Sequence, residues 1–194
     1  KTWHRRCGIG ARRRLPLLRR RRPKIHTHLA SSRRSNRSAR RARRAGAHNI
    51  RIQALVDESD VELRAHRGRY DRVLVDAPCS GSGTLRRNPD LRNRPLDLPA
   101  LATLQRRILS AAAGLVAPGG RLIYATCSVA DAENREVVAG FLRDHPDFSR
   151  LSAQAVMAQA GLALPDTLFR DADFQPTPHV HGTDGFYGAV LQRA

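Results

Sequence analysis

The chain contains few cysteines, no long apolar run and no acidic residue in its first 45 positions. Its three cysteines, Cys7, Cys79 and Cys127, lie far apart and form no CxxC pair, which disfavours a zinc ribbon and a disulfide framework. There is no uninterrupted stretch of about 18 apolar residues and no charged segment leading into an apolar one at the start. We therefore expect no membrane span and no signal peptide, and a cytoplasmic protein with reduced thiols.

Two further ligand-binding patterns are missing. No group of histidines, cysteines or carboxylates has the spacing of metal ligands, so we expect no metal ion. The loop Gly81-Ser82-Gly83 lacks the Lys-Ser or Lys-Thr ending of a phosphate-binding loop, so nucleotide hydrolysis is not supported.

The positive charge is concentrated at one end of the chain. Residues 1–45 hold 18 Lys or Arg and no acid, whereas residues 46–194 hold 17 basic and 17 acidic residues. The formal charge of +18 therefore belongs to the first segment. Such a segment can bind nucleic-acid phosphates, it can be a solvated and poorly ordered tail, or it can be a corrupted stretch read out of frame. We predict an arginine-rich, poorly packed segment at 1–45 and a folded domain at 46–194.

Alternating strands and helices indicate an α/β fold. Apolar residues at helical spacing predict an amphipathic helix over 99–116, stopped by Pro118-Gly119-Gly120. Further helices are expected at 32–44, ended by Gly46, and at 131–145; strands are expected at 50–55, 73–75, 121–127 and in a final segment up to Leu191. This order implies an open, mostly parallel sheet covered by helices.

Two cysteines follow two of these strands directly. Cys79 comes after the strand that ends near Asp76, and Cys127 ends the strand that begins at Arg121. Ligands bind at the carboxyl ends of strands in such sheets, so both thiols are expected to face one crevice. A lone cysteine is often a small buried apolar residue, but two at successive strand ends favour a functional pair.

Three blocks of the sequence resemble one enzyme family. They are DAPCSGSGTLRRNPD (Asp76–Asp90), YATCS (Tyr124–Ser128) and HGTDGFYGAVL (His181–Leu191). These blocks are similar to signatures of the RsmB/Nop2/Sun family of S-adenosyl-methionine-dependent RNA cytosine-5 methyltransferases, in particular its bacterial ribosomal-RNA branch. The resemblance covers about residues 46–194. It implies the C-terminal part of a Rossmann-like class I methyltransferase domain, incomplete at its N-terminus.

The resemblance implies roles for both cysteines. Cys127, in the TCS block, is expected to attack carbon-6 of the cytosine, and Cys79, in the PCS block, is expected to help release the enzyme after methylation. The partner is expected to be RNA, with ribosomal RNA foremost and the target base unpaired or flipped out. We expect a monomer with neither a membrane nor a metal as partner.

The resemblance also implies residues that bind S-adenosyl-methionine. Asp76 matches a family carboxylate at the junction of cofactor and target base, although an Asp at a strand end also caps turns. Asp57 matches an acid near the adenine, although it can equally be an exposed loop carboxylate. Lys1 matches the tail of a GGKT-like glycine-rich cofactor loop, of which the rest is expected before this segment.

Two alternatives stay open at this point. In DNA cytosine methyltransferases the Pro-Cys thiol is the nucleophile, which would reverse the roles of Cys79 and Cys127; the TCS and HGTDGF blocks argue against this reading. The other alternative is an inactive fragment that binds RNA non-specifically through residues 1–45. Binding of S-adenosyl-methionine separates that alternative from an enzyme.

Overall fold

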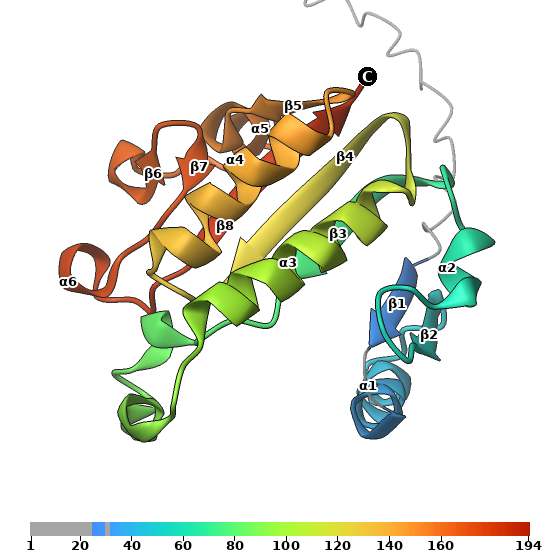
Figure 1. The fold of residues 1–194 in the computed structure, drawn as a ribbon, viewed down its shortest axis with the longest axis horizontal. Coiled ribbons are helices and arrows are strands. Elements are labelled where there is room, and N and C mark those ends of the chain that lie inside the picture. Colours follow the sequence, from blue (N-terminus) through green and yellow to red (C-terminus); the bar gives the residue numbers. More distant parts are fainter. Residues whose placement is uncertain (1–24, 30–31) are drawn as a thin grey trace, which may run out of the picture. The chain divides into compact units, whose positions relative to one another are not determined.

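The computed structural model describes residues 25–29 and 32–194, which form two compact units that divide after Ala54 (Figure 1). The first unit consists of strand β1 (Ile25–Leu29), helix α1 (Ser32–Arg44) and strand β2 (Ile50–Ala54). The two strands pair in parallel along their whole length. A parallel pair needs a crossover connection, and α1 provides it.

Helix α1 and strand β2 confirm the elements predicted for this part of the chain. The helix ends where Gly46 adopts a positive φ of 63°. The Gly46 N–H donates to the carbonyl of Arg43 at 3.1 Å, and the Ala47 N–H donates to that of Ala42 at 2.9 Å. These two bonds satisfy carbonyls that the last turn leaves open, and glycine adopts the left-handed conformation without steric cost.

The second unit is built on a six-stranded sheet with the order β3-β4-β8-β7-β6, in which β5 also pairs with β8. Its strands are β3 (Tyr70–Asp76), β4 (Val116–Thr126), β5 (Phe148–Leu151), β6 (Phe169–Arg170), β7 (Asp173–Phe174) and β8 (Tyr187–Arg193). The strands predicted around 73–75, at 121–127 and up to Leu191 are confirmed.

The directions of these strands make the sheet mixed. Only β3 and β4 are parallel; β8 runs antiparallel to β4, β5 and β7, and β6 runs antiparallel to β7. The α/β class is confirmed, but this sheet is mixed rather than mostly parallel. Helices follow both β3 and β4, but the last strand, β8, enters the sheet between β4 and β7 in the direction opposite to both, and this makes the sheet mixed.

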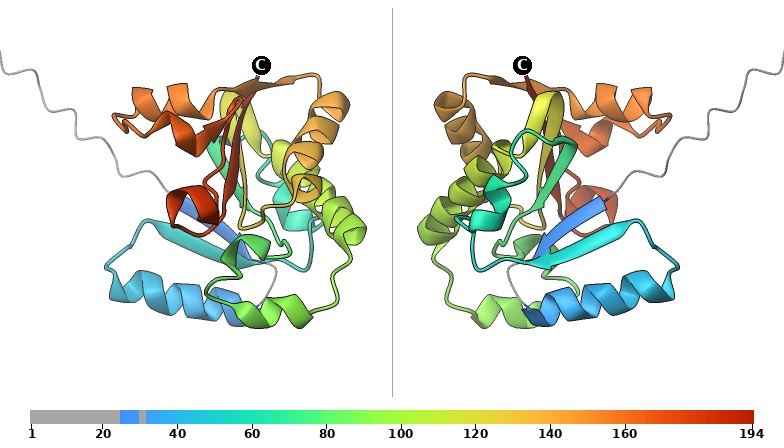
Figure 2. Two further views of the ribbon diagram at one scale, coloured as in Figure 1. Left: turned by 90° about the vertical axis from the view of Figure 1, so that its left-hand side faces the viewer. Right: turned by 90° about the vertical axis from the view of Figure 1, so that its right-hand side faces the viewer.

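Helices α3 (Leu98–Ala113) and α4 (Arg135–Asp144) lie side by side over one face of this sheet (Figures 1 and 2). The remaining elements are α2 (Val61–Arg64), α5 (Ala153–Gln159), α6 (Pro178–His181) and the 3-10 turns η1 (Ser82–Thr84), η2 (Pro89–Asn93), η3 (Asp131–Glu133) and η4 (Asp166–Leu168). Every helix in the described part of the chain is too short or too polar to span a bilayer.

The hydrophobic core lies between these two helices and the sheet. Leu122 and Tyr124 alternate along β4 and are fully buried, as are Leu109 of α3 and Phe141 of α4. Alternate residues of a strand point to the same face, so the even-numbered residues of β4 from Gly120 to Thr126 form the floor of the core. This packing fixes where the carboxyl ends of β3 and β4 lie.

The predicted helix over 99–116 is confirmed with earlier ends. Asp97 caps it by accepting a hydrogen bond from the Ala100 N–H at 2.9 Å, and it ends at Ala113. Pro118-Gly119-Gly120 does not stop this helix but lies within β4, where the register with β3 shifts and Gly119 has a φ of 72°.

Candidate active site

The two cysteines lie together at the carboxyl ends of β3 and β4. Asp76 pairs with Ala125 in the parallel ladder, so the chain leaves both strands at the same edge. The sulfur atoms of Cys79 and Cys127 lie 3.5 Å apart, and each residue is half-buried. The two thiols therefore lie side by side at one edge of the sheet, as the sequence predicts; that they face a ligand-binding crevice stays a prediction.

The third sequence block packs directly against the first two. The Gly83 N–H donates to the carbonyl of Cys127 at 3.0 Å, and the Gly185 N–H donates to that of Gly83 at 2.9 Å. A Cβ atom on Gly83 would lie 2.1 Å from the carbonyl oxygen of Gly185. Glycine is therefore required here, because two backbones approach more closely than a side chain permits.

An ion pair also joins the first block to the third. The guanidinium of Arg87, just after η1, pairs with the carboxylate of Asp184, just before Gly185. The Asp184 side chain is 6% exposed and that of Arg87 is 65% exposed. The loop that carries Gly185 is therefore held to the cysteine edge by backbone bonds and by charge.

Glu133 lies beneath both cysteine loops. Its side chain is fully buried at the end of η3. One oxygen, Oε1, accepts from the Ser80 N–H at 2.8 Å and from the Gln105 Nε2 at 3.0 Å. The other, Oε2, accepts from the hydroxyls of Ser80 at 2.6 Å and Ser128 at 2.5 Å. Ser80 follows Cys79 and Ser128 follows Cys127.

Asn134, also fully buried, holds the Cys127 loop from its other side. Its Oδ1 accepts from the hydroxyl of Thr126 at 2.5 Å, and its Nδ2 donates to the carbonyl of Ser128 at 2.9 Å. The residues on both sides of Cys127 are thus tied to neighbouring positions, Glu133 and Asn134. Cys127, between them, is half-buried.

The environment of Cys79 keeps its thiol protonated. Burial raises the pKa of Cys79 to about 12, and the hydrogen bond to Cys127 contributes in the same direction. Burial disfavours the charged form of an acid, so this thiol is neutral near pH 7. It can donate its proton in a hydrogen bond to the neighbouring sulfur.

The predicted carboxylates occupy two places in the structure. Asp76 is exposed at the end of β3, three positions before Cys79. Asp57 is exposed in the loop before α2, where the hydroxyl and N–H of Ser59 donate to its Oδ1 at 2.6 and 2.8 Å. These bonds lower the pKa of Asp57. Within residues 25–29 and 32–194, no hydrogen bond joins Asp57 to a cysteine, and Lys1 lies outside them.

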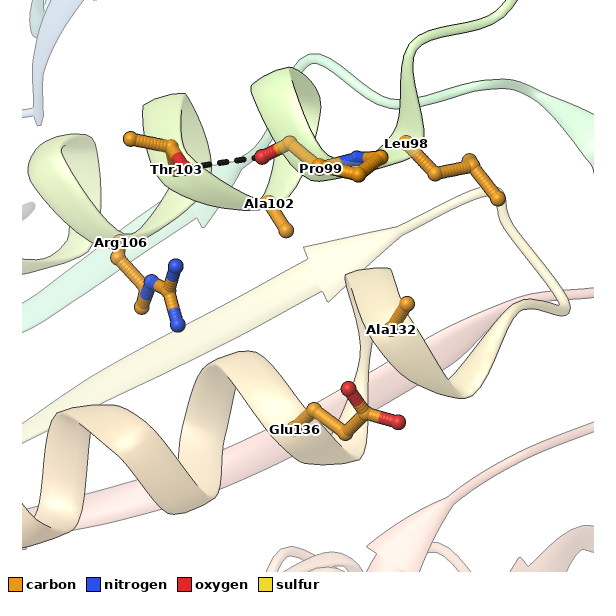
Figure 3. Close-up of a pocket in the computed structure, with 7 residues that line it drawn as sticks. All are labelled: Leu98, Pro99, Ala102, Thr103, Arg106, Ala132 and Glu136. Atoms are coloured by element: carbon orange, nitrogen blue, oxygen red, sulfur yellow. Dashed lines mark hydrogen bonds between the residues drawn. The ribbon is translucent and has the colours of Figure 1, made fainter.

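A shallow groove on the helical face is separate from the thiols. It lies between α3 and α4 and is lined by Leu98, Pro99, Ala102, Thr103, Arg106, Ala132 and Glu136 (Figure 3). Neither cysteine lines it. In the described part of the chain no group of His, Cys, Asp or Glu is arranged to hold a metal ion.

Sequence reasoning missed Glu133, Asn134 and the two serines. An acid at the start of an amphipathic helix normally faces solvent, and both Glu133 and Glu136 fit that pattern. Only Glu136 is exposed. The one available signal was the small polar residue after each cysteine, Ser80 and Ser128, since matching hydroxyls at two strand ends indicate a shared partner.

Comparison with known proteins gives one family. The family model for 16S rRNA methyltransferase RsmB/F matches residues 15–192. The chain is 52% identical over 124 residues to ribosomal RNA small subunit methyltransferase B of Sodalis glossinidius, covering 63% of this chain and 26% of that protein. It is 43% identical over 131 residues to the probable ribosomal RNA small subunit methyltransferase B of Bacillus subtilis, covering 64% and 28%. The matches thus span about a quarter of these relatives.

Solved structures resemble the fold. The crystal structure of PH0851 superposes with a TM-score of 0.73 at 33% identity, covering 88% of this chain and 37% of that one. A methyltransferase homolog protein from Pyrococcus horikoshii superposes with a TM-score of 0.64 at 26% identity, covering 88% and 53%. The mixed sheet with flanking helices is therefore a methyltransferase fold.

Proposed function

The chain belongs to the 16S rRNA methyltransferase RsmB/F family, and from this premise we propose that it carries the catalytic cysteines of an enzyme that methylates carbon-5 of a cytidine in ribosomal RNA. The observation that carries the proposal is the pair of thiols 3.5 Å apart at the ends of two parallel strands. Carbon-5 of cytosine is a weak nucleophile, and a thiol that adds to the ring activates it.

S-adenosyl-methionine supplies a methyl group on a positively charged sulfonium. The two carboxylates that the resemblance assigns to the cofactor suit it chemically, because they offer acceptor oxygens and negative charge. Asp76 is exposed at the strand end that leads to Cys79. Asp57 has a lowered pKa and is ionised at neutral pH. We assign Asp76 to the junction of cofactor and base, Asp57 to the adenine end, and Lys1 to the glycine-rich loop.

Cys127 is the proposed nucleophile. Its thiolate forms a bond from Sγ to carbon-6, and the electron pair of the carbon-5–carbon-6 double bond becomes available at carbon-5, which takes the methyl group. A base then removes the proton from carbon-5. The electrons of that C–H bond restore the double bond, and the Sγ–carbon-6 bond breaks with its electrons returning to sulfur.

Cys79 is the proposed release residue. Its raised pKa of about 12 makes it a poor nucleophile near pH 7, because the thiolate is the reactive form. A neutral thiol 3.5 Å from Cys127 can instead donate a hydrogen bond to the departing sulfur. The raised pKa of Cys79 therefore speaks against the reversed, DNA-type arrangement, in which Cys79 would attack.

A label-transfer assay tests the proposed reaction. The chain is incubated with methyl-labelled S-adenosyl-methionine and small-subunit ribosomal RNA that lacks base methylation, and the nucleosides are separated by mass spectrometry. We expect the label in 5-methylcytidine, and the same result with the control variant Cys7→Ser. Label in another nucleoside would contradict the proposed chemistry.

A second candidate function is RNA binding without catalysis. It is favoured by the 18 basic residues and the absence of acid in residues 1–45. Within the part of α1 whose exposure is described, residues 36–44, all five arginines are exposed. Calorimetric titration with S-adenosyl-methionine separates the two functions. Saturable binding supports the enzyme, and RNA binding with no heat from the cofactor supports the second candidate.

A further inference from the structure

We propose that Glu133 is the positioning residue of the cysteine pair: its carboxylate holds the Cys79 loop and the Cys127 loop at one point and thereby sets the separation of the two thiols. The inference rests on the proposed function for its catalytic meaning. Its geometric content concerns only Glu133, the two serines and the sulfur atoms.

Both cysteine loops converge on one oxygen of Glu133, Oε2. The Ser80 and Ser128 hydroxyls donate to the same Oε2 at 2.6 and 2.5 Å, and the two hydroxyls lie 3.3 Å from each other. Each serine directly follows one of the cysteines. A shift of either serine therefore moves one thiol relative to the other.

Glu133 is itself held in place by residues of α3 and β4. The Gln105 side chain reaches Oε1 from α3 at 3.0 Å, and the Tyr124 hydroxyl donates to the Glu133 backbone carbonyl from β4 at 2.6 Å. Gln105 and Tyr124 are both fully buried. The position of Glu133 is therefore set by the core elements α3 and β4 as well as by the two loops that its carboxylate binds.

The Glu133 carboxylate is buried among hydrogen-bond donors. Among the described residues no cation forms an ion pair with Glu133, and the groups that face its side chain are four donors on Ser80, Ser128 and Gln105. A carboxylate accepts hydrogen bonds only, and leaving one buried without donors is costly. The carboxylate thus draws both loops onto itself more strongly than a neutral acceptor would.

The consequence is a specific effect on the thiols. Glu133 is fully buried, so it does not touch RNA and should leave RNA affinity unchanged. Small displacements of reacting groups lower rates by roughly 100-fold. Loss of the carboxylate should therefore lower kcat for methyl transfer and leave KM for RNA in place.

The test measures the thiol pair directly in the full chain with Cys7→Ser. Phenylarsine oxide joins two thiols at one arsenic atom, forming two S–As bonds and releasing one water, so its affinity reports how well the sulfurs are juxtaposed. We expect Glu133→Gln, which keeps the shape and removes the charge, to weaken binding of this probe by roughly 10- to 100-fold. The matched control Glu136→Gln, exposed in the groove three positions later, should bind it like the parent chain.

Thermal unfolding of each variant identifies a folding defect. If Glu133→Gln does not fold, Ser128→Ala replaces it, because that change removes one of the hydroxyls from Oε2 and leaves the carboxylate in place. Parent-like affinity in the folded Glu133→Gln variant, or in Ser128→Ala when it is used, overturns the inference. Weakened affinity in either supports it.

The probe requires neither RNA nor S-adenosyl-methionine, so its result is independent of methyl transfer. A weakened arsenical affinity together with no methyl transfer by the parent chain would contradict the proposed function alone. Active enzyme with unchanged arsenical affinity in Glu133→Gln would contradict the positioning role alone. In an active enzyme we further expect Glu133→Gln and Ser128→Ala to be non-additive in kcat, since both act through one contact.

Discussion

At the scale of single residues, two sulfur atoms 3.5 Å apart have different surroundings. Cys79 directly follows Pro78, and the Nε2 of the buried Gln105 donates to the backbone carbonyl of Pro78 at 2.9 Å. Burial is the largest cause of its raised pKa, ahead of the contact with Cys127. Burial therefore keeps the Cys79 thiol protonated near pH 7, beside the sulfur of Cys127.

The raised pKa of Cys79 predicts a defined alkylation profile. In the unfolded chain the thiol has a pKa near 9.0, and in the folded chain near 12. At pH 8 iodoacetamide should therefore modify Cys79 roughly 100- to 1,000-fold more slowly in the folded chain than in urea, as the thiolate is the reactive form. Peptide mass spectrometry distinguishes Cys79 from the other thiols. The slow rate should persist in Cys127→Ala, because burial is the main cause.

The same shift fixes the sign of a stability change. Between pH 9 and 12 the unfolded state binds fewer protons at Cys79 than the folded state, so the free energy of unfolding falls as pH rises. The contribution is fully present below pH 9 and is lost toward pH 12. Equal alkylation of Cys79 in folded and unfolded chain at pH 8 would contradict this account.

Sequence could identify some of these residues and not others. The placement of Cys79, Cys127 and Asp76 at strand ends was predictable because they stand at or just after apolar runs; their roles stay predictions. Glu133 was not predictable, because its burial depends on how η3 packs beneath two loops from distant parts of the chain. Asp76 and Asp57 were assigned to the cofactor only by resemblance, and these roles stay predictions.

At the scale of elements, local sequence patterns predicted where helices and strands lie along the chain but not in which direction the strands run in the sheet. The capped, amphipathic α3 and the alternating β4 were predictable because their signals lie within the element. The antiparallel course of β8 was not, because strand direction depends on the end of the sheet from which the preceding loop enters, and that is a tertiary feature. Pro118-Gly119-Gly120 was assigned wrongly for a similar reason. Proline and glycine occur at irregularities within strands as well as at the ends of helices, and local sequence does not separate the two.

The close contact between the η1 loop and the loop before β8 predicts that a methyl group added at Gly83 strongly lowers stability. In Gly83→Ala the new Cβ would lie 2.1 Å from the Gly185 carbonyl oxygen and 2.9 Å from that of Cys127, both backbone atoms. We expect a loss of roughly 1–3 kcal/mol in the free energy of unfolding, as in other overpacked sites, and weakened binding of phenylarsine oxide. Urea denaturation measures the first quantity.

Gly188→Ala is the matched control within β8. Its Cβ would meet the Phe174 side chain at 3.7 Å, an ordinary contact, so the stability of this variant should change by only about 0.5 kcal/mol. Similar stabilities of the Gly83 and Gly188 variants would show that the two loops do not pack as described.

At the scale of the whole molecule, the net charge and the paired thiols occupy different parts of the chain. All of the net charge of +18 belongs to residues 1–45, whereas the two thiols and their supports belong to the unit Leu55–Ala194. The predicted boundary near residue 45 rested on composition. Whether residues 46–194 resist limited proteolysis as one piece stays a prediction.

The arginines of α1 predict salt-sensitive RNA binding. Arg40, Arg41, Arg43 and Arg44 are exposed near its C-terminal end. Each phosphate contact contributes about one unit to the slope of log affinity against log salt. Replacing these four arginines by glutamine should therefore lower the slope by up to roughly four, measured by fluorescence anisotropy with labelled RNA. Arg143→Gln on α4 is the control and should keep the slope. An unchanged slope in the fourfold variant would place RNA binding elsewhere.

The most direct test of the central claim, that Cys127 attacks and Cys79 releases, is the protein–RNA adduct formed by each cysteine variant under methylating conditions. Cys127→Ala removes the attacking thiol, so no adduct should form and the methylation rate should fall by several orders of magnitude. Cys79→Ala still permits attack and transfer but delays release, so an adduct that survives denaturing gel electrophoresis should accumulate. An adduct in Cys127→Ala and none in Cys79→Ala would contradict the assignment.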